Sequence, residues 1–94
     1  MNELGELYDL LDEVSPKQRD ASRVFRLLVL NGVSNIDILA SWDTDKLNEF
    51  AKNTKYIGKE RRKILEDAVL KAKVKVYIDN IKPAMKKLAV ETFL

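Results

Sequence analysis

The sequence predicts an all-α protein, folded as a compact bundle of five or six short helices. Apolar residues recur three and four positions apart along most of the 94 residues, which is the spacing of one helix face. Serine, asparagine and aspartate residues, which cap helix starts, separate these apolar runs. The chain has only three glycines and two prolines, too few for the many turns of an all-β fold.

The first two helices are predicted on either side of a Ser-Pro pair. Residues 2–13 place leucines at helical spacing, with acidic residues on the opposite face. Ser15 has the side chain of an N-cap, Pro16 suits the first helical position, and Gln18 completes a capping-box pattern. The second helix is therefore expected from about Pro16 to Leu30.

Three further helices follow from caps and stops. The Asn31-Gly32 pair ends the second helix, with its glycine in the left-handed conformation. Ser34 is expected to cap a short third helix, and Asp43 a fourth that ends at Asn53-Thr54. The fifth helix is predicted to begin after Gly58.

The C-terminal part allows two interpretations. Lys73–Ile78 alternates like a strand, but no second strand is predicted to pair with it, so continuation of the fifth helix is favoured. Pro83 is expected to break or kink this helix before a last amphipathic segment. We expect one helical domain over residues 1–94, with a block at about 16–72 and a helical extension at about 73–94.

Ten apolar residues at inward-facing positions are expected to form the core. They are Leu10, Phe25, Leu28, Val33, Leu39, Leu47, Phe50, Ile64, Leu65 and Val69. Trp42, in a short turn between helices, is expected to cover this core rather than to hold a ligand.

The chain contains no cysteine and no histidine. Disulfides and thiolate metal sites are thereby excluded, and the commonest metal ligand and general base is missing. No glycine-rich phosphate loop or nucleophile elbow is present, so we expect no enzyme activity, no cofactor, no metal and no small-molecule substrate. The longest apolar run, Leu27–Leu30, is too short to cross a membrane, and the acidic N-terminus is unlike a signal peptide. We expect a cytoplasmic or nucleoid-associated protein, and a phage or mobile-element origin fits equally.

The net charge of +2 conceals an asymmetry between the two halves of the chain. Residues 1–50 carry five basic and ten acidic side chains, net −5, whereas residues 51–94 carry twelve and five, net +7. The basic half could face a polyanion. The two halves could equally attract each other, within one molecule or between molecules.

The most basic stretch is Lys52–Lys63, with the sequence KNTKYIGKERRK. Its glycine lies at a helix start, where backbone N–H groups and the helix dipole favour an anion such as a DNA phosphate. The cations of this stretch are Lys52, Lys55, Lys59, Arg61, Arg62 and Lys63. Tyr56 could stack on a sugar or base, or pack beneath the loop. No set of side chains suggests base readout, so DNA binding would be largely independent of sequence. The plainer alternative is a solvated surface.

The block from Arg23 to Val69 carries an arginine ahead of an apolar helix, an Asn-Gly-Val turn, a capped short helix and an Ile-Gly-Lys turn before the last helix. The residues of this pattern are Arg23, Asn31-Gly32-Val33, Ile36, Leu39, Asp43-Thr44-Asp45, Leu47, Ile57-Gly58-Lys59, Ile64 and Leu65. The block thereby resembles the helix-hairpin-helix class of DNA-binding modules, and within it the C-terminal domain of the RNA polymerase alpha subunit.

The resemblance implies that DNA-facing residues lie at the start of the helix before the first glycine turn and at the start of the last helix. By position these are Arg23, Arg26, Gly58, Lys59 and Arg61. With the neighbouring cations of the basic stretch, the residues expected to bind double-stranded DNA are Arg23, Arg26, Lys55, Gly58, Lys59, Arg61, Arg62 and Lys63. We therefore expect a non-enzymatic accessory module that holds duplex DNA through its backbone phosphates.

The five-helix layout with a basic last helix also resembles a sterile alpha motif (SAM) domain. That resemblance implies a protein-interaction adaptor that self-associates head to tail. The start of the last helix in one molecule would meet an acidic surface on another molecule or on a different protein. The acidic residues concerned are Asp37, Asp43, Asp45 and Glu49. A third alternative is that the acidic first half mimics DNA and binds a basic partner.

Overall fold

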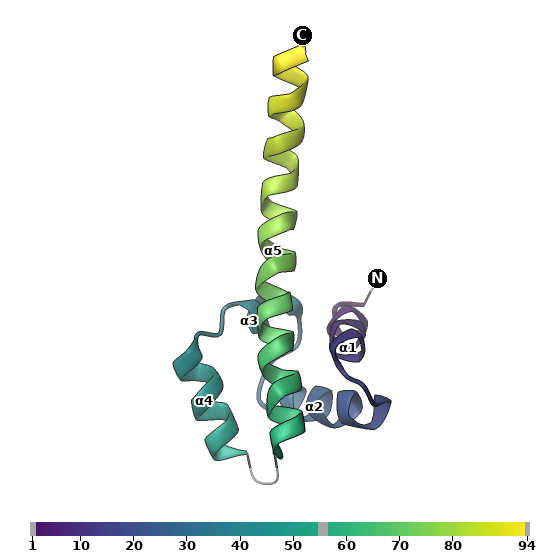
Figure 1. Cartoon of the computed structure of the whole chain (residues 1–94), viewed down its shortest axis with the longest axis vertical. Helices are drawn as coiled ribbons and strands as arrows, with labels where there is room; N and C mark the ends of the chain where they lie inside the picture. The colour runs from purple at the N-terminus through teal and green to yellow at the C-terminus, as the bar shows by residue number, and fades with distance from the viewer. Residues whose placement is uncertain (1, 55–56, 94) are drawn as a thin grey trace.

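The computed structural model describes residues 2–54 and 57–93, with side chains described for residues 2–54 and 57–81. The protein is all-helical, as the sequence predicts. Its helices are α1 (Glu3–Val14), α2 (Gln18–Leu30), α3 (Ile36–Ala40), α4 (Thr44–Asn53) and α5 (Lys59–Phe93). Helix α5 lies along the long axis, and the other four helices gather around its N-terminal half (Figure 1). The molecule measures 57 × 27 × 22 Å because the rest of α5 projects beyond this bundle.

Short side chains cap three helix starts. Asn2 Oδ1 accepts a hydrogen bond from the backbone N–H of Leu4 at 3.0 Å, at the start of α1. Asp43 Oδ1 accepts one from Lys46 N–H at 2.7 Å, which confirms the predicted cap of α4. The cap of α3 lies one residue later than predicted, because Asn35 rather than Ser34 accepts from the first turn.

The prediction that Ser15 caps α2 is wrong. Helix α2 begins at Gln18, and the preceding residue Lys17 makes no side-chain capping bond. The Ser15 hydroxyl instead donates to the carbonyl of Leu11 at 2.7 Å, so that it completes the last turn of α1. Serine can bond a carbonyl four residues back as readily as an N–H ahead, and the sequence pattern does not distinguish the two.

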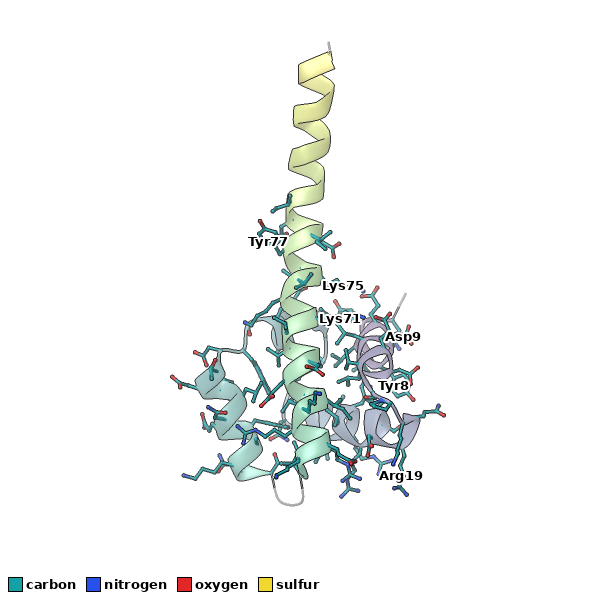
Figure 2. The ribbon with its side chains drawn as sticks, in the orientation of Figure 1. Tyr8, Asp9, Arg19, Lys71, Lys75 and Tyr77 are labelled. Carbon is teal, nitrogen blue, oxygen red and sulfur yellow. The ribbon has the colours of Figure 1, made fainter. Side chains whose placement is uncertain are left out.

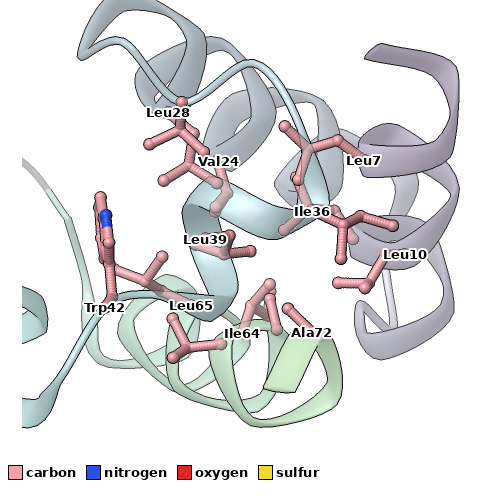
Figure 3. Close-up of a cluster of buried hydrophobic side chains, with 14 of the residues drawn as sticks. Leu7, Leu10, Val24, Leu28, Ile36, Leu39, Trp42, Ile64, Leu65 and Ala72 are labelled. Atoms are coloured by element: carbon pink, nitrogen blue, oxygen red, sulfur yellow. The ribbon is translucent and has the colours of Figure 1, made fainter. Parts of the chain in front are cut away.

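The core is centred on the five-residue helix α3, which lies against α5 (Figure 3). Leu39 of α3 and Leu65 of α5 are both completely buried. Nine of the ten predicted core residues are buried. The tenth, Phe25, is half-buried and meets Tyr8 edge to face with ring centroids 5.5 Å apart. Trp42 covers the core as expected, since it is only 5% exposed and lies 5.1 Å from Phe50 between ring centroids.

Helix α5 is continuous for 35 residues. Lys73–Ile78, which alternates like a strand, is helical, and the helix does not end at Pro83. Proline removes one backbone hydrogen bond, and here the turns on either side carry the helix across it. Within the residues that the structure describes, no helix combines the length and hydropathy needed to cross a bilayer.

Two ion pairs join the acidic first half of the chain to the basic second half. Asp20 of α2 pairs with Arg61 of α5 at 3.2 Å. Glu13 at the end of α1 pairs with Lys71 further along α5. The charge asymmetry of the sequence is thus partly satisfied within one molecule.

The Glu13–Lys71 pair predicts a measurable change in the titration of the Glu13 carboxyl group. The hydrogen bond and the charge of Lys71 lower the pKa of Glu13, and the charge of Lys75 adds to this effect. We expect Lys71→Met to raise the pKa of Glu13 towards its ordinary value in a carboxyl ¹³C NMR titration. Lys63→Met, which removes a charge elsewhere on α5, should leave that pKa unchanged.

The same shift fixes the sign of the pH effect on stability. Because the folded-state pKa is the lower one, the contribution of Glu13 is present above its unfolded-state pKa and is lost as pH falls through the folded value. The contribution is small, since the Lys71 and Glu13 side chains are 45% and 58% exposed. A pKa for Glu13 that does not respond to Lys71→Met would contradict the assignment.

Candidate nucleic-acid interface

The starts of α2 and α5 meet at one end of the molecule. Arg61 Nε donates to Asp20 Oδ1 at 3.2 Å, although the two residues are 41 positions apart in the chain. Asp20 is 8% exposed and is the one charged residue that is buried among those described. A buried carboxylate needs a partner of this kind, so the contact fixes the first turn of α2 against that of α5.

A cavity of about 340 Å³ lies beside this contact, between the two helix starts. It is lined by Val14, Pro16, Lys17, Asp20, Glu60, Lys63, Ile64 and Asp67. The lining combines two lysines, three carboxylates and three apolar side chains. Lys17 and Lys63 are thereby placed near each other, although they come from opposite halves of the chain.

Five exposed cations surround the two helix starts. We call this group the cationic end, and its members are Lys17, Arg19, Arg23, Lys59 and Lys63. Arg19 lies at the end of the molecule where α5 begins (Figure 2). Arg23 lies on α2 between Asp20, which contacts α5, and Leu27, which lines a groove with α4. Arg23, Lys59 and Lys63 are among the DNA contacts that the sequence predicts, but Lys17 and Arg19 are not, because only the long-range contact of Asp20 brings them to this end.

Three of the predicted DNA-binding residues have other surroundings. Arg61 is engaged with Asp20, and its side chain is 26% exposed. Arg62 donates to Asn48 Oδ1 of α4 at 2.7 Å and pairs with Glu66 at 3.3 Å. Arg26 lies away from α5, in an apolar groove with Tyr8 and Phe25. Arg61 and Arg62 thus join helices, although Arg62 remains 47% exposed, and Arg26 is exposed.

The backbone at Gly58 is exposed, as the sequence predicts. Its carbonyl accepts from Arg62 N–H at 2.9 Å, so α5 is wound from this residue onward. The N–H groups of the following first turn have no acceptor within the helix and carry the positive end of its dipole. Lys55 and Tyr56, which the sequence analysis also named, lie outside the described residues.

The acidic residues named for the alternative interface lie on α3, on α4 and at the N-cap of α4. Asp37, Asp43, Asp45 and Glu49 are all exposed. Asp43 already uses one oxygen to cap α4. Glu49 lines a groove of about 380 Å³ with Trp42 and Lys46. Among the described residues, no group of three or more carboxylates is arranged to hold a metal ion.

No protein-family model matches the chain, and neither does any curated protein or solved structure. The resemblance to helix-hairpin-helix and SAM domains therefore remains a prediction from the residues. What the structure defines is an all-helical protein with an exposed, largely cationic end built from two helix starts.

The two turn glycines predict opposite responses to alanine. Gly32 has a φ of 87°, in the region that side chains disfavour, whereas Gly58 lies outside that region and a Cβ there would meet no atom within 4 Å. We expect Gly32→Ala to lower the free energy of unfolding by about 1 kcal/mol. Gly58→Ala should leave it unchanged or raise it slightly, as measured by urea denaturation. An equal loss at the two positions would show that Gly58 also needs glycine.

The Asp20–Arg61 pair predicts a specific cost for removing the arginine. Arg61→Met leaves a buried carboxylate unpaired, and we expect the free energy of unfolding to fall by about 1–3 kcal/mol. Lys63→Met removes an exposed charge from the same helix and should change it by less than about 0.5 kcal/mol. The double variant Asp20→Asn with Arg61→Met should recover part of the loss. Equal stabilities for Arg61→Met and Lys63→Met would contradict a structural role for the pair.

Proposed function

We propose that the protein is a non-enzymatic accessory module that binds double-stranded DNA through its backbone phosphates, largely independently of sequence. One observation carries the proposal: the Asp20–Arg61 contact joins the starts of α2 and α5, so that five exposed cations share one end of the molecule. The resemblance of the block from Arg23 to Val69 to helix-hairpin-helix modules supports the same function.

The chemistry of this end suits a phosphate chain better than a single base. Lysine and arginine side chains neutralise phosphates, and the first turns of two helices add N–H donors and partial positive charge. Lys59 and Lys63 are one helical turn apart on α5, so they extend the positive surface along one line. The sequence suggests no set of side chains for base readout, so we expect binding to be largely independent of sequence.

Neighbouring carboxylates set the expected strength. Glu60 and Asp67 line the same cavity as Lys17 and Lys63, while the charge of Asp20 is neutralised by Arg61. These acids reduce the local positive potential, so we expect weak, salt-sensitive binding rather than a tight complex. If about four of the five cations meet phosphates, log K should fall with log salt with a slope of about −4.

A fluorescence-anisotropy titration with a random-sequence duplex of about 20 bp, at about 50 mM and about 200 mM salt, tests the proposal. Lys59→Glu with Lys63→Glu should weaken binding about tenfold or more and reduce the salt slope. These two lysines are chosen because, unlike Arg61, they are not tied to a buried partner.

The matched control reverses two exposed lysines elsewhere, Lys46→Glu with Lys75→Glu, and so changes the net charge by the same amount. We expect its affinity to stay within about threefold of the parent protein at the higher salt concentration. Absence of binding at the lower salt concentration, or equal losses in the two double variants, would overturn the proposal.

Protein interaction is a second candidate function, favoured by the exposed acidic residues of α3 and α4. Asp37, Asp45 and Glu49 are exposed and lie on helices other than those of the cationic end. Contact between these two surfaces of different molecules would be heterologous, so it would extend beyond two copies. It would also weaken as salt is added, since both surfaces are charged.

A further inference from the structure

Helix α5 carries two apolar sides. From Ile64 to Ala72 every apolar residue except Leu70 is buried in the core, where Leu65 and Ala68 are completely buried, and Val76 packs against the same core. Leu70 and Val74 lie two residues to either side of Ala72, which turns each of them about 160° away from it around the helix axis. Both are exposed, so the helix carries a second apolar stripe on its outer side.

This second stripe is large and contiguous. Leu70 is 63% exposed, Tyr77 65%, Ile78 50% and Val74 48%. The other four helices pack against α5 along its N-terminal half, and the stripe continues where α5 projects beyond them (Figure 1). Contiguous exposed apolar surface of this kind is uncommon on a monomer and marks an interaction site.

The spacing of the stripe is that of a coiled coil. Leu70, Val74, Tyr77 and Ile81 are separated by four, three and four residues, and the sequence continues the pattern with Ala84 and Leu88. Val74 and Ile81 then occupy a positions, and Leu70 and Tyr77 occupy d positions. Ile78 falls at an adjacent e position and widens the apolar surface, and the sequence places Met85 at the next e position.

We propose that this stripe, the α5 seam, pairs in parallel with the α5 seam of a second copy to form a two-stranded coiled coil. Its members in the described part of the chain are Leu70, Val74, Tyr77, Ile78 and Ile81. The pairing makes a homodimer whose two bundles lie side by side. It does not depend on DNA binding.

The available area is sufficient for a reversible dimer. The 24 residues from Leu70 to Phe93 span about 36 Å. Four of the seven heptad positions face the partner, which is about half the circumference of the helix. For a helix about 11 Å across, this gives a buried area of about 600 Å² per copy. The total of about 1,200 Å² is at the small end of specific interfaces, so we expect a dissociation constant in the micromolar range.

The flanking charges favour the parallel orientation. In a parallel pair each g residue meets the e residue five positions later on the partner. Glu66, which pairs with Arg62 in its own chain, thereby comes opposite Lys71, which pairs with Glu13, so no like charges meet there, and Lys73 and Asn80 come opposite the uncharged Ile78 and Met85. An antiparallel pair centred on Asn80 would instead bring Lys73 of each copy to Lys87 of the other. Like charges would then repel at both ends of the interface.

Sedimentation velocity of the whole chain from about 5 to about 500 µM tests the pairing. We expect the mass to rise from the 10.8 kDa of one chain to twice that value and no further. Raising salt from about 150 to about 500 mM should leave the dimer in place, because an apolar seam holds it. Val74→Glu with Ile81→Glu should abolish the dimer and leave the urea midpoint of the monomer unchanged.

The matched control is Lys75→Glu with Asp79→Lys, which exchanges two charges on the same helix away from the seam and keeps the net charge. It should dimerise like the parent protein. Orientation is tested by single cysteines, which are free of background because the chain has none. Under mild oxidation Val74→Cys should form a disulfide-linked dimer, since a positions meet in parallel pairs, whereas Asp79→Cys should not.

Several results would overturn the proposal. One is a protein that stays monomeric at the highest concentration while its circular dichroism remains helical. If that monomer also binds vesicles of equal phosphatidylglycerol and phosphatidylcholine, the α5 seam would be assigned to a lipid surface. Another is salt-sensitive growth beyond two copies, which would assign association to the charged surfaces. Equal cross-linking at positions 74 and 79 would exclude the parallel seam.

Discussion

Burial of one side of α5 is the constraint around which the other four helices are arranged. Leu65, Ala68 and Ala72 are completely buried, and the short helix α3 lies directly on them with Leu39 equally inaccessible. Full burial of a leucine contributes about 1.5–3 kcal/mol, so this contact line outweighs any single polar interaction described for the protein. This buried contact line also positions the Asp20–Arg61 pair, because Arg61 lies in the first turn of the same helix.

Signals local to a few residues predicted the fold well. The left-handed Gly32, the Asp43 cap and the helical spacing of the core residues are each decided within about one turn, and each is confirmed. The errors arise where one residue has two local options of similar energy. Ser15 bonds backward to Leu11 rather than forward, and Asn35 displaces Ser34 as a cap.

The candidate site was less predictable, because its composition depends on a contact that spans 41 residues. Periodicity places Arg61 at a helix start but does not show that Asp20 neutralises it. For the same reason Lys17 and Arg19 could not be predicted from the sequence, because they lie at the start of α2 and only the Asp20–Arg61 contact places that start beside α5. Arginines divide here between joining helices, as Arg61 and Arg62 do, and facing solvent, as Arg19 and Arg23 do.

Because α5 carries an inner and an outer apolar side, the number of residues along the helix decides in which direction the outer side faces. The number of residues between Ala72 and Tyr77 sets the angle between the buried side of α5 and the part of the α5 seam that lies beyond Ala72. Deleting or inserting one residue there would turn everything beyond it by about 100°, whereas inserting a whole heptad would turn it by only about 20°. In natural variants, insertions of seven residues in this stretch would therefore be tolerated far better than insertions of one or two.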